Sequence, residues 1–259
     1  MDLPDLGLLA LVAGAADILP VDSSTHAMIV ARLLRLRAGT LAPALHFGVA
    51  LALTLYFWRE IALIASGLWK LRKARIEAGT RLLAKMLVAA IPFLLLDCGV
   101  AGFQMPEVAS VFWIGVITLI CALIMLFADR LSLTVKRIDH IGALTSLSVG
   151  LAQAVALIGG IGRLPAALIL ARLFGMERSD AFRFVLLSSL PILLTEGVAG
   201  LLHGGRSPGL PDALALGLSF AAAMIALPVG FAVMRRAGLL PFALYRLLFG
   251  AALISLGLL

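Results

Sequence analysis

Asp17-Ile-Leu-Pro-Val-Asp-Ser-Ser-Thr-His26 is a polar stretch that separates two apolar segments, residues 6–16 and residues 27–34. Neither segment is long enough to cross a bilayer, because a spanning helix needs about 20 apolar residues. Pro20 interrupts a helix, and Asp22 with the hydroxyl residues after it can cap a new one. The pattern predicts that residues 6–34 form a re-entrant hairpin whose polar tip lies inside the membrane.

The tip of this hairpin is a candidate functional site. Irregular backbone is tolerated at membrane depth only where it is buried in protein or lines a wet cavity. Ionisable side chains at that depth are costly and usually serve a function. The tip carries two carboxylates, two serine hydroxyls and an imidazole close together in sequence: Asp17, Asp22, Ser23, Ser24 and His26.

The composition of the chain is that of a polytopic membrane protein. Of its 259 residues, 62% are hydrophobic and 14% are charged, and the mean hydropathy is +1.11. A soluble domain could not bury so much apolar surface, so we expect residues 1–259 to form one integral membrane domain. The net charge of +7 lies largely in short loops between apolar segments. This favours contact with anionic membrane lipids and argues against a nucleic-acid partner.

The hairpin pattern returns in the second half of the chain. Met28-Ile-Val-Ala-Arg-Leu-Leu34 is similar to Leu168-Ile-Leu-Ala-Arg-Leu-Phe174. Extended without gaps, this register pairs Ser23 with Arg163 and predicts a second hairpin at residues 143–174. The tip of the second hairpin is rich in glycine, a residue that permits a sharp turn.

Three spans are expected after each hairpin. They are residues 40–58, 82–103, 107–128, 181–203, 211–234 and 240–258. A hairpin leaves the membrane on the side where it entered, so three crossings invert the second half (residues 139–259) relative to the first (residues 1–138). The two tips would then meet near the midplane. We therefore predict an all-α polytopic membrane protein with an inverted-topology repeat, each half a re-entrant helical hairpin plus three transmembrane helices.

Basic segments indicate the orientation of the chain. Residues 59–85 and 130–137 are rich in lysine and arginine, and such segments usually face the cytoplasm, the first as an amphipathic stretch on the membrane surface. This arrangement puts both chain ends outside. Two arginines after the fifth span agree with it, whereas three arginines after the first hairpin would face outward: Arg32, Arg35 and Arg37.

The residue types at the two tips suit phosphoryl transfer. A serine or histidine can act as the nucleophile, carboxylates can hold a divalent metal ion, and an arginine fork matches two phosphate oxygens. Arg163 beside a glycine turn is typical of an anion clamp. A structural interpretation is also open, in which Asp22 and the serines only cap the helix and Arg163 pairs with Asp17 to neutralise it.

Four stretches of the chain, taken in order, carry a resemblance to a known family. They are residues 17–26, Gly150-Leu-Ala-Gln153 with Gly160-Ile-Gly-Arg163, Ser179-Asp-Ala-Phe-Arg-Phe184 with Pro191, and Phe242-Ala-Leu-Tyr-Arg246 with Gly250. The first resembles Glu-Phe-Leu-Pro-x-Ser-Ser-Thr-Gly-His, and the second resembles a Gly-x-x-Gln stretch that leads into Pro-Gly-x-Ser-Arg-Ser-Gly. In motifs and order the chain resembles the bacterial undecaprenyl-diphosphatase family (the bacitracin-resistance type).

The resemblance implies a multi-pass enzyme of the bacterial inner membrane that removes one phosphate from undecaprenyl diphosphate, a polyprenyl diphosphate lipid. The implied catalytic residues are Ser23, His26 and Arg163. The implied substrate contacts are Arg163, Gly160, Gly162, Ser24 and Gln153. The implied cofactor is a divalent cation, Mg²⁺ or Ca²⁺, held by Asp17 and, as a second candidate, Asp22. The sequence does not decide whether Ser23 or His26 is the nucleophile, and it leaves a homodimer open.

Several positions depart from the family pattern. Ala13 stands where the family has its first acidic residue, and Asp22, Ser24 and Thr25 replace Ser, Thr and Gly. Hydroxyl residues are also missing around Arg163. These departures keep two alternatives open: a non-catalytic polyprenyl-phosphate binder or translocase on the same fold, and a transporter of another anion.

Two polar residues inside the expected spans are weaker candidates. His46 is expected to have a packing role. Glu196 is expected to line the cavity or to pair with Arg183 or His26.

Overall fold

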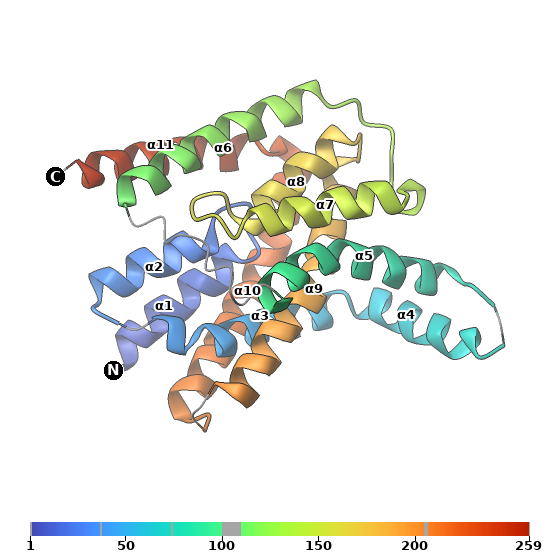
Figure 1. Cartoon of the computed structure of the whole chain (residues 1–259), viewed down its shortest axis with the longest axis horizontal. Helices are drawn as coiled ribbons and strands as arrows, with labels where there is room; N and C mark the ends of the chain where they lie inside the picture. The colour runs from blue at the N-terminus through green and yellow to red at the C-terminus, as the bar shows by residue number, and fades with distance from the viewer. Residues whose placement is uncertain (1, 37, 74, 100–109, 205–206, 259) are drawn as a thin grey trace.

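The computed structural model describes residues 2–36, 38–73, 75–99, 110–204 and 207–258. These residues are mainly α-helical (Figure 1). In chain order the helices are α1 (Leu3–Ala16), α2 (Ser23–Leu33), α3 (Ala42–Tyr56), α4 (Trp58–Leu71), α5 (Ala78–Gly99), α6 (Val111–Leu131), α7 (Ala143–Val155), α8 (Arg163–Leu173), α9 (Arg178–His203), α10 (Leu210–Ala237) and α11 (Leu240–Gly257).

Both predicted hairpins are present, as the pairs α1/α2 and α7/α8. The second arms match closely, since α2 and α8 each have 11 residues and begin at Ser23 and Arg163. These are the two residues that the sequence register pairs. The two tips approach each other at the centre of the molecule (Figure 1), where the Gly160 backbone N–H donates to an Asp22 carboxylate oxygen at 2.9 Å.

The long helices confirm a multi-pass membrane protein. Within the described ranges, five helices are long and apolar enough to cross a membrane: α5, α6, α9, α10 and α11. The remaining expected span, residues 40–58, is a bent pair in which α3 and α4 meet at 81°. Its aromatic end, Tyr56 to Trp58, is therefore a bend into a second helix. That helix lies in the segment predicted to rest on the membrane surface.

The helix limits differ from the expected spans by a few residues. Helix α5 begins at Ala78, before the expected start at residue 82, and α6 runs on to Leu131. The expected end of the second span (residue 103) and start of the third (residue 107) fall outside the described residues. Helix α9 begins at Arg178 because the chain turns directly out of the second hairpin.

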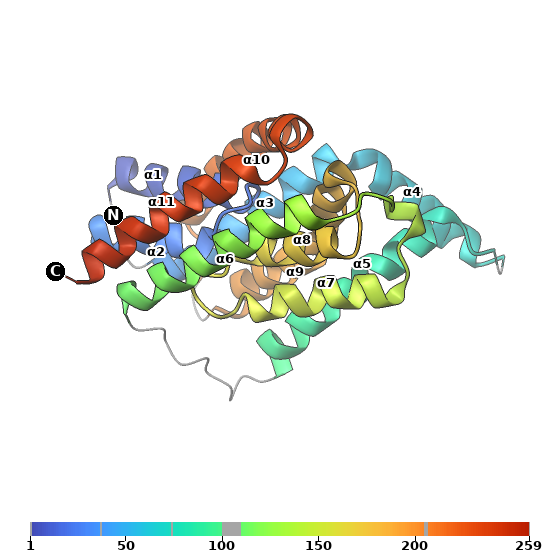
Figure 2. The same cartoon turned by 90° about the horizontal axis from the view of Figure 1, so that it is seen from above.

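The packing of the helices follows a repeated pattern. Helix α1 of the first hairpin packs against α10, and α7 of the second hairpin packs against α5. Helix α3 packs against α9, and α6 lies along α11 in both views (Figures 1 and 2). The first arm of each hairpin thus contacts a long helix of the other half. Inversion of one half relative to the other stays a prediction.

Small residues let the hairpins approach these long helices closely. A Cβ on Gly14 of α1 would lie 2.5 Å from the Ser219 carbonyl oxygen of α10, and a Cβ on Gly150 of α7 would lie 2.5 Å from the Ala89 carbonyl oxygen of α5. Helix association inside membranes relies on such close van der Waals packing, because lipid is as apolar as the side chains. The two glycines therefore allow the first arm of each hairpin to lie close against a long helix.

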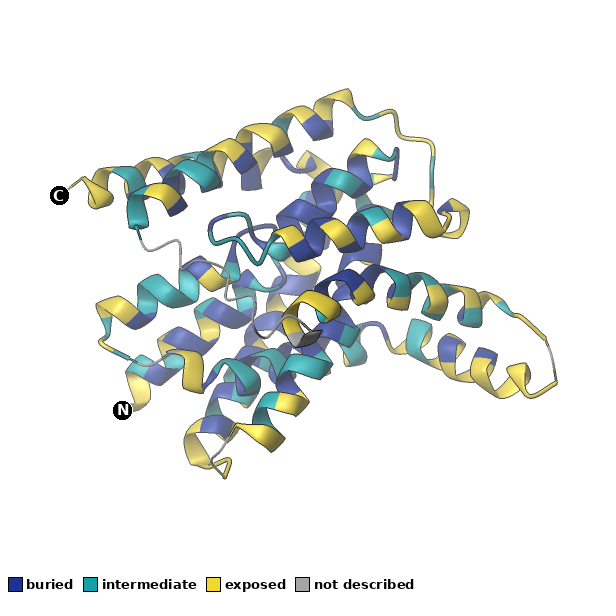
Figure 3. Cartoon of the chain, in the orientation of Figure 1, coloured by how far each residue is buried: buried dark blue, intermediate teal, exposed yellow. Residues whose placement is uncertain are grey.

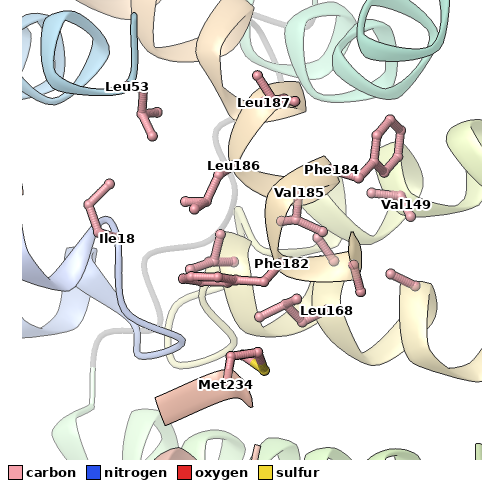
Figure 4. Close-up of a cluster of buried hydrophobic side chains, with 14 of the residues drawn as sticks. Ile18, Leu53, Val149, Leu168, Phe182, Phe184, Val185, Leu186, Leu187 and Met234 are labelled. Atoms are coloured by element: carbon pink, nitrogen blue, oxygen red, sulfur yellow. The ribbon is translucent and has the colours of Figure 1, made fainter. Parts of the chain in front are cut away.

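A buried apolar cluster surrounds the N-terminal half of α9. Phe182, Phe184 and Leu186 are fully buried there, together with Leu168 of α8 and Ile18 of the first tip (Figure 4). The outer helix faces, by contrast, expose many large apolar side chains (Figure 3). An exposed apolar surface of this extent marks contact with another apolar phase, here the lipid.

Candidate active site

The first element of the site is a contact between the two arms of the first hairpin. Asp17 is the C-cap residue of α1, and Ser23 is the first residue of α2. The Ser23 hydroxyl donates to Asp17 Oδ1 at 2.5 Å. A serine hydroxyl bonded to a carboxylate has an acceptor ready for its proton, which is the arrangement that activates a nucleophile.

Arg163 reaches the same carboxylate from the second hairpin. It is the first residue of α8, and its Nη2 lies 3.9 Å from Asp17 Oδ1. Ser23 and Arg163 thus contact one oxygen atom, as their pairing in the repeat predicts. The Arg163 side chain is only 14% exposed, and its guanidinium lies over the Phe93 ring, 5.7 Å from the ring centroid.

Glu196 and His46 extend this cluster. Arg163 Nη1 lies 3.5 Å from Glu196 Oε2, and the same oxygen lies 3.2 Å from His46 Nδ1. The expected pairing of Glu196 with Arg183 or His26 is therefore wrong. Arg183 pairs with Glu60 instead. A continuous polar path runs from the serine to the histidine: Ser23, Asp17, Arg163, Glu196 and His46.

A cavity of about 470 Å³ opens beside this path. Its polar lining consists of Asp17, Ser23, Ser24, Arg32 and His46. The rest of the wall is apolar, from Ala13, Ala27, Met28, Ala31, Leu36, Gly39, Ala42 and Leu45. The packing role expected for His46 is thus incomplete, because the imidazole also faces the cavity. An apolar cavity with a few polar groups in its lining suits a lipid with an anionic headgroup.

Both carboxylate oxygens of Asp22 accept hydrogen bonds from the protein. It is 2% exposed and is the N-cap residue of α2. One oxygen accepts from the Ser24 hydroxyl at 2.6 Å and from the Thr25 backbone N–H at 3.5 Å. The other accepts from the Thr25 hydroxyl and from the Gly160 N–H. A carboxylate has about four lone-pair sites, so these four bonds occupy Asp22 fully.

The glycine turn of the second hairpin is clamped between charged groups. Gly160 donates its N–H to Asp22, and its carbonyl accepts from Arg246 Nη2 at 2.8 Å. Arg246 is 1% exposed and also donates to the Ile161 carbonyl at 2.9 Å. Gly160 and Gly162 have φ values of +89° and +78°, which only glycine adopts without strain. The predicted substrate contact of the Gly160 amide is therefore occupied by Asp22, and the turn serves to place Arg163.

His26 faces a different helix from Ser23. Its Nδ1 lies 2.6 Å from the Asp22 carbonyl oxygen, so this nitrogen carries the proton and donates. Its Nε2 then accepts from the Tyr245 hydroxyl at 2.6 Å, and the ring stacks on Phe249 of α11 at 4.3 Å between centroids. In the part of the chain that the structure describes, His26 makes no hydrogen bond with Ser23.

Gln153 is not brought to the cavity. The side chain is fully buried and donates to the Ala89 carbonyl at 3.1 Å and to the Ser188 hydroxyl at 3.3 Å. It also accepts from the Ser189 hydroxyl at 3.3 Å. These bonds join α7 to α5 and α9. Gln153 therefore supports the second hairpin from behind instead of facing the cavity.

The carboxylates expected to hold a cation occupy unlike positions. Asp17 lines the cavity, whereas Asp22 lies within the hydrogen bonds of the tip. Among the residues described, no group of three or more His, Cys, Asp or Glu side chains converges on a common metal position.

The fold and the cluster together define a class of protein: an integral membrane protein in which two helical hairpins bring a serine, a carboxylate and an arginine together inside the helix bundle. The chain belongs to the family described as Bacitracin resistance protein BacA, which matches residues 7–252. This confirms the family that the ordered motifs resemble.

Relatives of similar length carry a consistent description. The chain is 35% identical to "Undecaprenyl-diphosphatase 1" of Rhodospirillum rubrum, over 96% of this chain and 93% of that protein. It is 33% identical to "Undecaprenyl-diphosphatase" of Jannaschia sp. and to that of Maricaulis maris, in each case over 98% of both chains.

Proposed function

We propose that this protein hydrolyses undecaprenyl diphosphate to undecaprenyl phosphate and inorganic phosphate, recycling the lipid carrier of cell-wall synthesis. The names of its relatives support the substrate and the reaction. The observation that carries the proposal is the contact of Ser23 with Asp17, beside Arg163 and in the lining of an apolar cavity.

Ser23 is the nucleophile of the proposed reaction. Its Oγ attacks the terminal phosphorus, and its proton passes to Asp17, which already accepts that hydrogen bond. The bond from the terminal phosphorus to the bridging oxygen breaks, and undecaprenyl phosphate leaves with the electron pair. The departing undecaprenyl phosphate takes up the proton that Asp17 received, which frees the carboxylate. Water then attacks the phosphoserine, Asp17 takes a proton from this water and returns it to Ser23 Oγ, and inorganic phosphate is released.

Arg163 binds the phosphate that is transferred. A guanidinium can donate two parallel hydrogen bonds to phosphate oxygens, where negative charge increases during the reaction. Glu196 and the Phe93 ring hold the guanidinium beside Asp17, which lines the cavity. His26, bonded to Tyr245 and to the Asp22 backbone, holds the start of α2 in place and so positions Ser23.

A divalent cation, Mg²⁺ or Ca²⁺, remains part of the proposal. Mg²⁺ is usually bound by one or two carboxylates together with substrate phosphate oxygens. Asp17 fits this role, because it lines the cavity. Asp22 fits it poorly, because its oxygens already accept four hydrogen bonds. When bound, such a cation would neutralise charge on the diphosphate.

We place the protein in the bacterial inner membrane with both chain ends outside and the segment from residue 59 to residue 85 in the cytoplasm. The amphipathic α4, with exposed Trp58 and Trp69 and a guanidinium over each ring, supports a helix at the membrane surface. Impermeant labelling of a cysteine at Ala78 from the outside would contradict this orientation.

The test of the function is phosphate release by purified protein from undecaprenyl and farnesyl diphosphate, with and without divalent cation. We expect release that falls after Ser23→Ala and after Asp17→Asn. Gly217→Ala is the matched control, because a Cβ there meets no atom within 4 Å. Binding of the lipid without any release would overturn the phosphatase and select the non-catalytic binder or translocase.

A further inference from the structure

The lining of the cavity beside Ser23 includes an exposed cationic side chain, Arg32, which marks the exposed end of the cavity. The residues of α2 that line the cavity fall into two rows spaced by four: Ser23, Ala27, Ala31 and Ser24, Met28, Arg32. Residues four apart lie on one face of a helix, and helical side chains lean toward the N-terminus. The Arg32 side chain is therefore on the same wall as the serines and leans toward them.

Among the described residues, the guanidinium of Arg32 has no partner. The residue is exposed, and no hydrogen bond or ion pair joins its side chain to any part of the described structure. Its counterpart in the second half, Arg172, is 2% exposed and pairs with Asp129 at 3.2 Å. The same position thus carries a structural ion pair in one half and an unpaired charge at a cavity in the other.

The negative charges of the site indicate why a cation at the Arg32 position would favour substrate binding. Asp17 and Glu196 both contact Arg163, so two carboxylates face one guanidinium. A diphosphate headgroup is itself strongly anionic and would be repelled at such a site. Arg32 adds the compensating positive charge along the path by which the headgroup enters.

We propose that Arg32 binds a phosphate group at the exposed end of the cavity. The inference rests on the proposed function, and it adds a residue that recognises the substrate. The phosphate has two possible sources: the diphosphate headgroup of the lipid, and inorganic phosphate on its way out. A role in binding an anion also accounts for an arginine at a membrane end where the expected orientation disfavours one.

Steady-state kinetics of Arg32→Gln, Arg32→Lys and Arg35→Gln test the proposal. Arg35 is the matched control, because it is exposed near the same helix end and does not line the cavity. We expect Arg32→Gln to raise KM for farnesyl diphosphate about tenfold at unchanged kcat, which corresponds to about 1.4 kcal/mol. Arg32→Lys should recover part of this loss, since it keeps the charge, and Arg35→Gln should change KM less than twofold.

The inhibition constant of inorganic phosphate separates the two sources. A rise in KM alone assigns Arg32 to the lipid headgroup, and a parallel rise in the inhibition constant assigns it also to the released phosphate. Equal behaviour of Arg32→Gln and Arg35→Gln in both measurements overturns the proposal. If the wild-type protein releases no phosphate, the proposed function fails. Equilibrium binding of farnesyl diphosphate to the same variants then decides on Arg32 independently.

Discussion

Replacing Asp22 by serine separates two roles that its position allows, a clamp between the hairpins and a metal ligand. Serine can still cap α2, because it is a good N-cap residue. It is too short to reach the Gly160 N–H, which would lose its acceptor in a buried turn. It would also leave the Arg246 guanidinium without the anion on the other side of that turn.

The expected loss of stability is about 2–4 kcal/mol. A buried donor left without a partner costs about 1–3 kcal/mol, and a hydrogen bond to a charged group contributes about 1.5–3 kcal/mol. Because serine can still cap α2, the net loss of stability is smaller than the sum of these two terms. For a protein of this size the apparent melting temperature should fall by roughly 10 °C. Turnover should also fall, because Arg163 comes directly after Gly162 and so depends on the clamped turn for its position.

The assay is thermal unfolding of the purified protein in detergent, together with phosphate release. Asp2→Ser is the matched control, because Asp2 is the N-cap residue of α1 and its side chain makes no capping bond. That variant should melt within about 1 °C of the wild type. The clamp is refuted if Asp22→Ser melts like the wild type, loses only cation-dependent turnover, and regains it when Ala13→Glu supplies another carboxylate.

Three further predictions follow from the same contacts. Arg163→Ala should lower kcat about 10²–10³-fold, the scale of losing a preorganised donor, and Arg163→Lys should restore little, since an ammonium lacks the bidentate fork. An unchanged kcat in either variant would contradict this role. Gly162→Ala should lower the free energy of unfolding by about 1–3 kcal/mol, because the φ of Gly162 is +78° and the new Cβ would lie 3.0 Å from Asp22 Cα. A melting temperature equal to that of Gly217→Ala would contradict this prediction. Chelation of divalent cations should abolish phosphate release without lowering the melting temperature, because in the proposed mechanism Asp17 would bind the cation only together with substrate. Full activity in chelator would remove the cation from the mechanism.

The hairpins could be predicted from the sequence because their signals are local. Apolar segments too short to span, a proline, a glycine-rich turn and an N-cap residue each restrict the backbone near themselves. The repeat register then paired Ser23 with Arg163, and the structure places both on Asp17. Local pattern and internal repeat together were sufficient for this part of the site.

The partners of Glu196 and Asp22 could not be predicted in the same way. Glu196 meets Arg163 and His46 only because α9 crosses both α8 and α3, and no spacing along the chain encodes this crossing. Asp22 has the sequence signature of a helix cap, and its bond to Gly160 depends on how the two tips meet. The bend at Phe57 was missed because an aromatic cluster is equally typical of a span end.

The most direct test of the mechanism is covalent labelling of the protein by undecaprenyl diphosphate that is radiolabelled in its terminal phosphate. Rapid quenching in denaturant at neutral pH, which preserves both phosphoserine and phosphohistidine, should trap phosphate on Ser23, and peptide mapping should locate the label in the first hairpin. Ser23→Ala should give neither label nor phosphate release. Phosphate trapped on His26, or full turnover by Ser23→Ala, would contradict the assignment of Ser23 as the nucleophile.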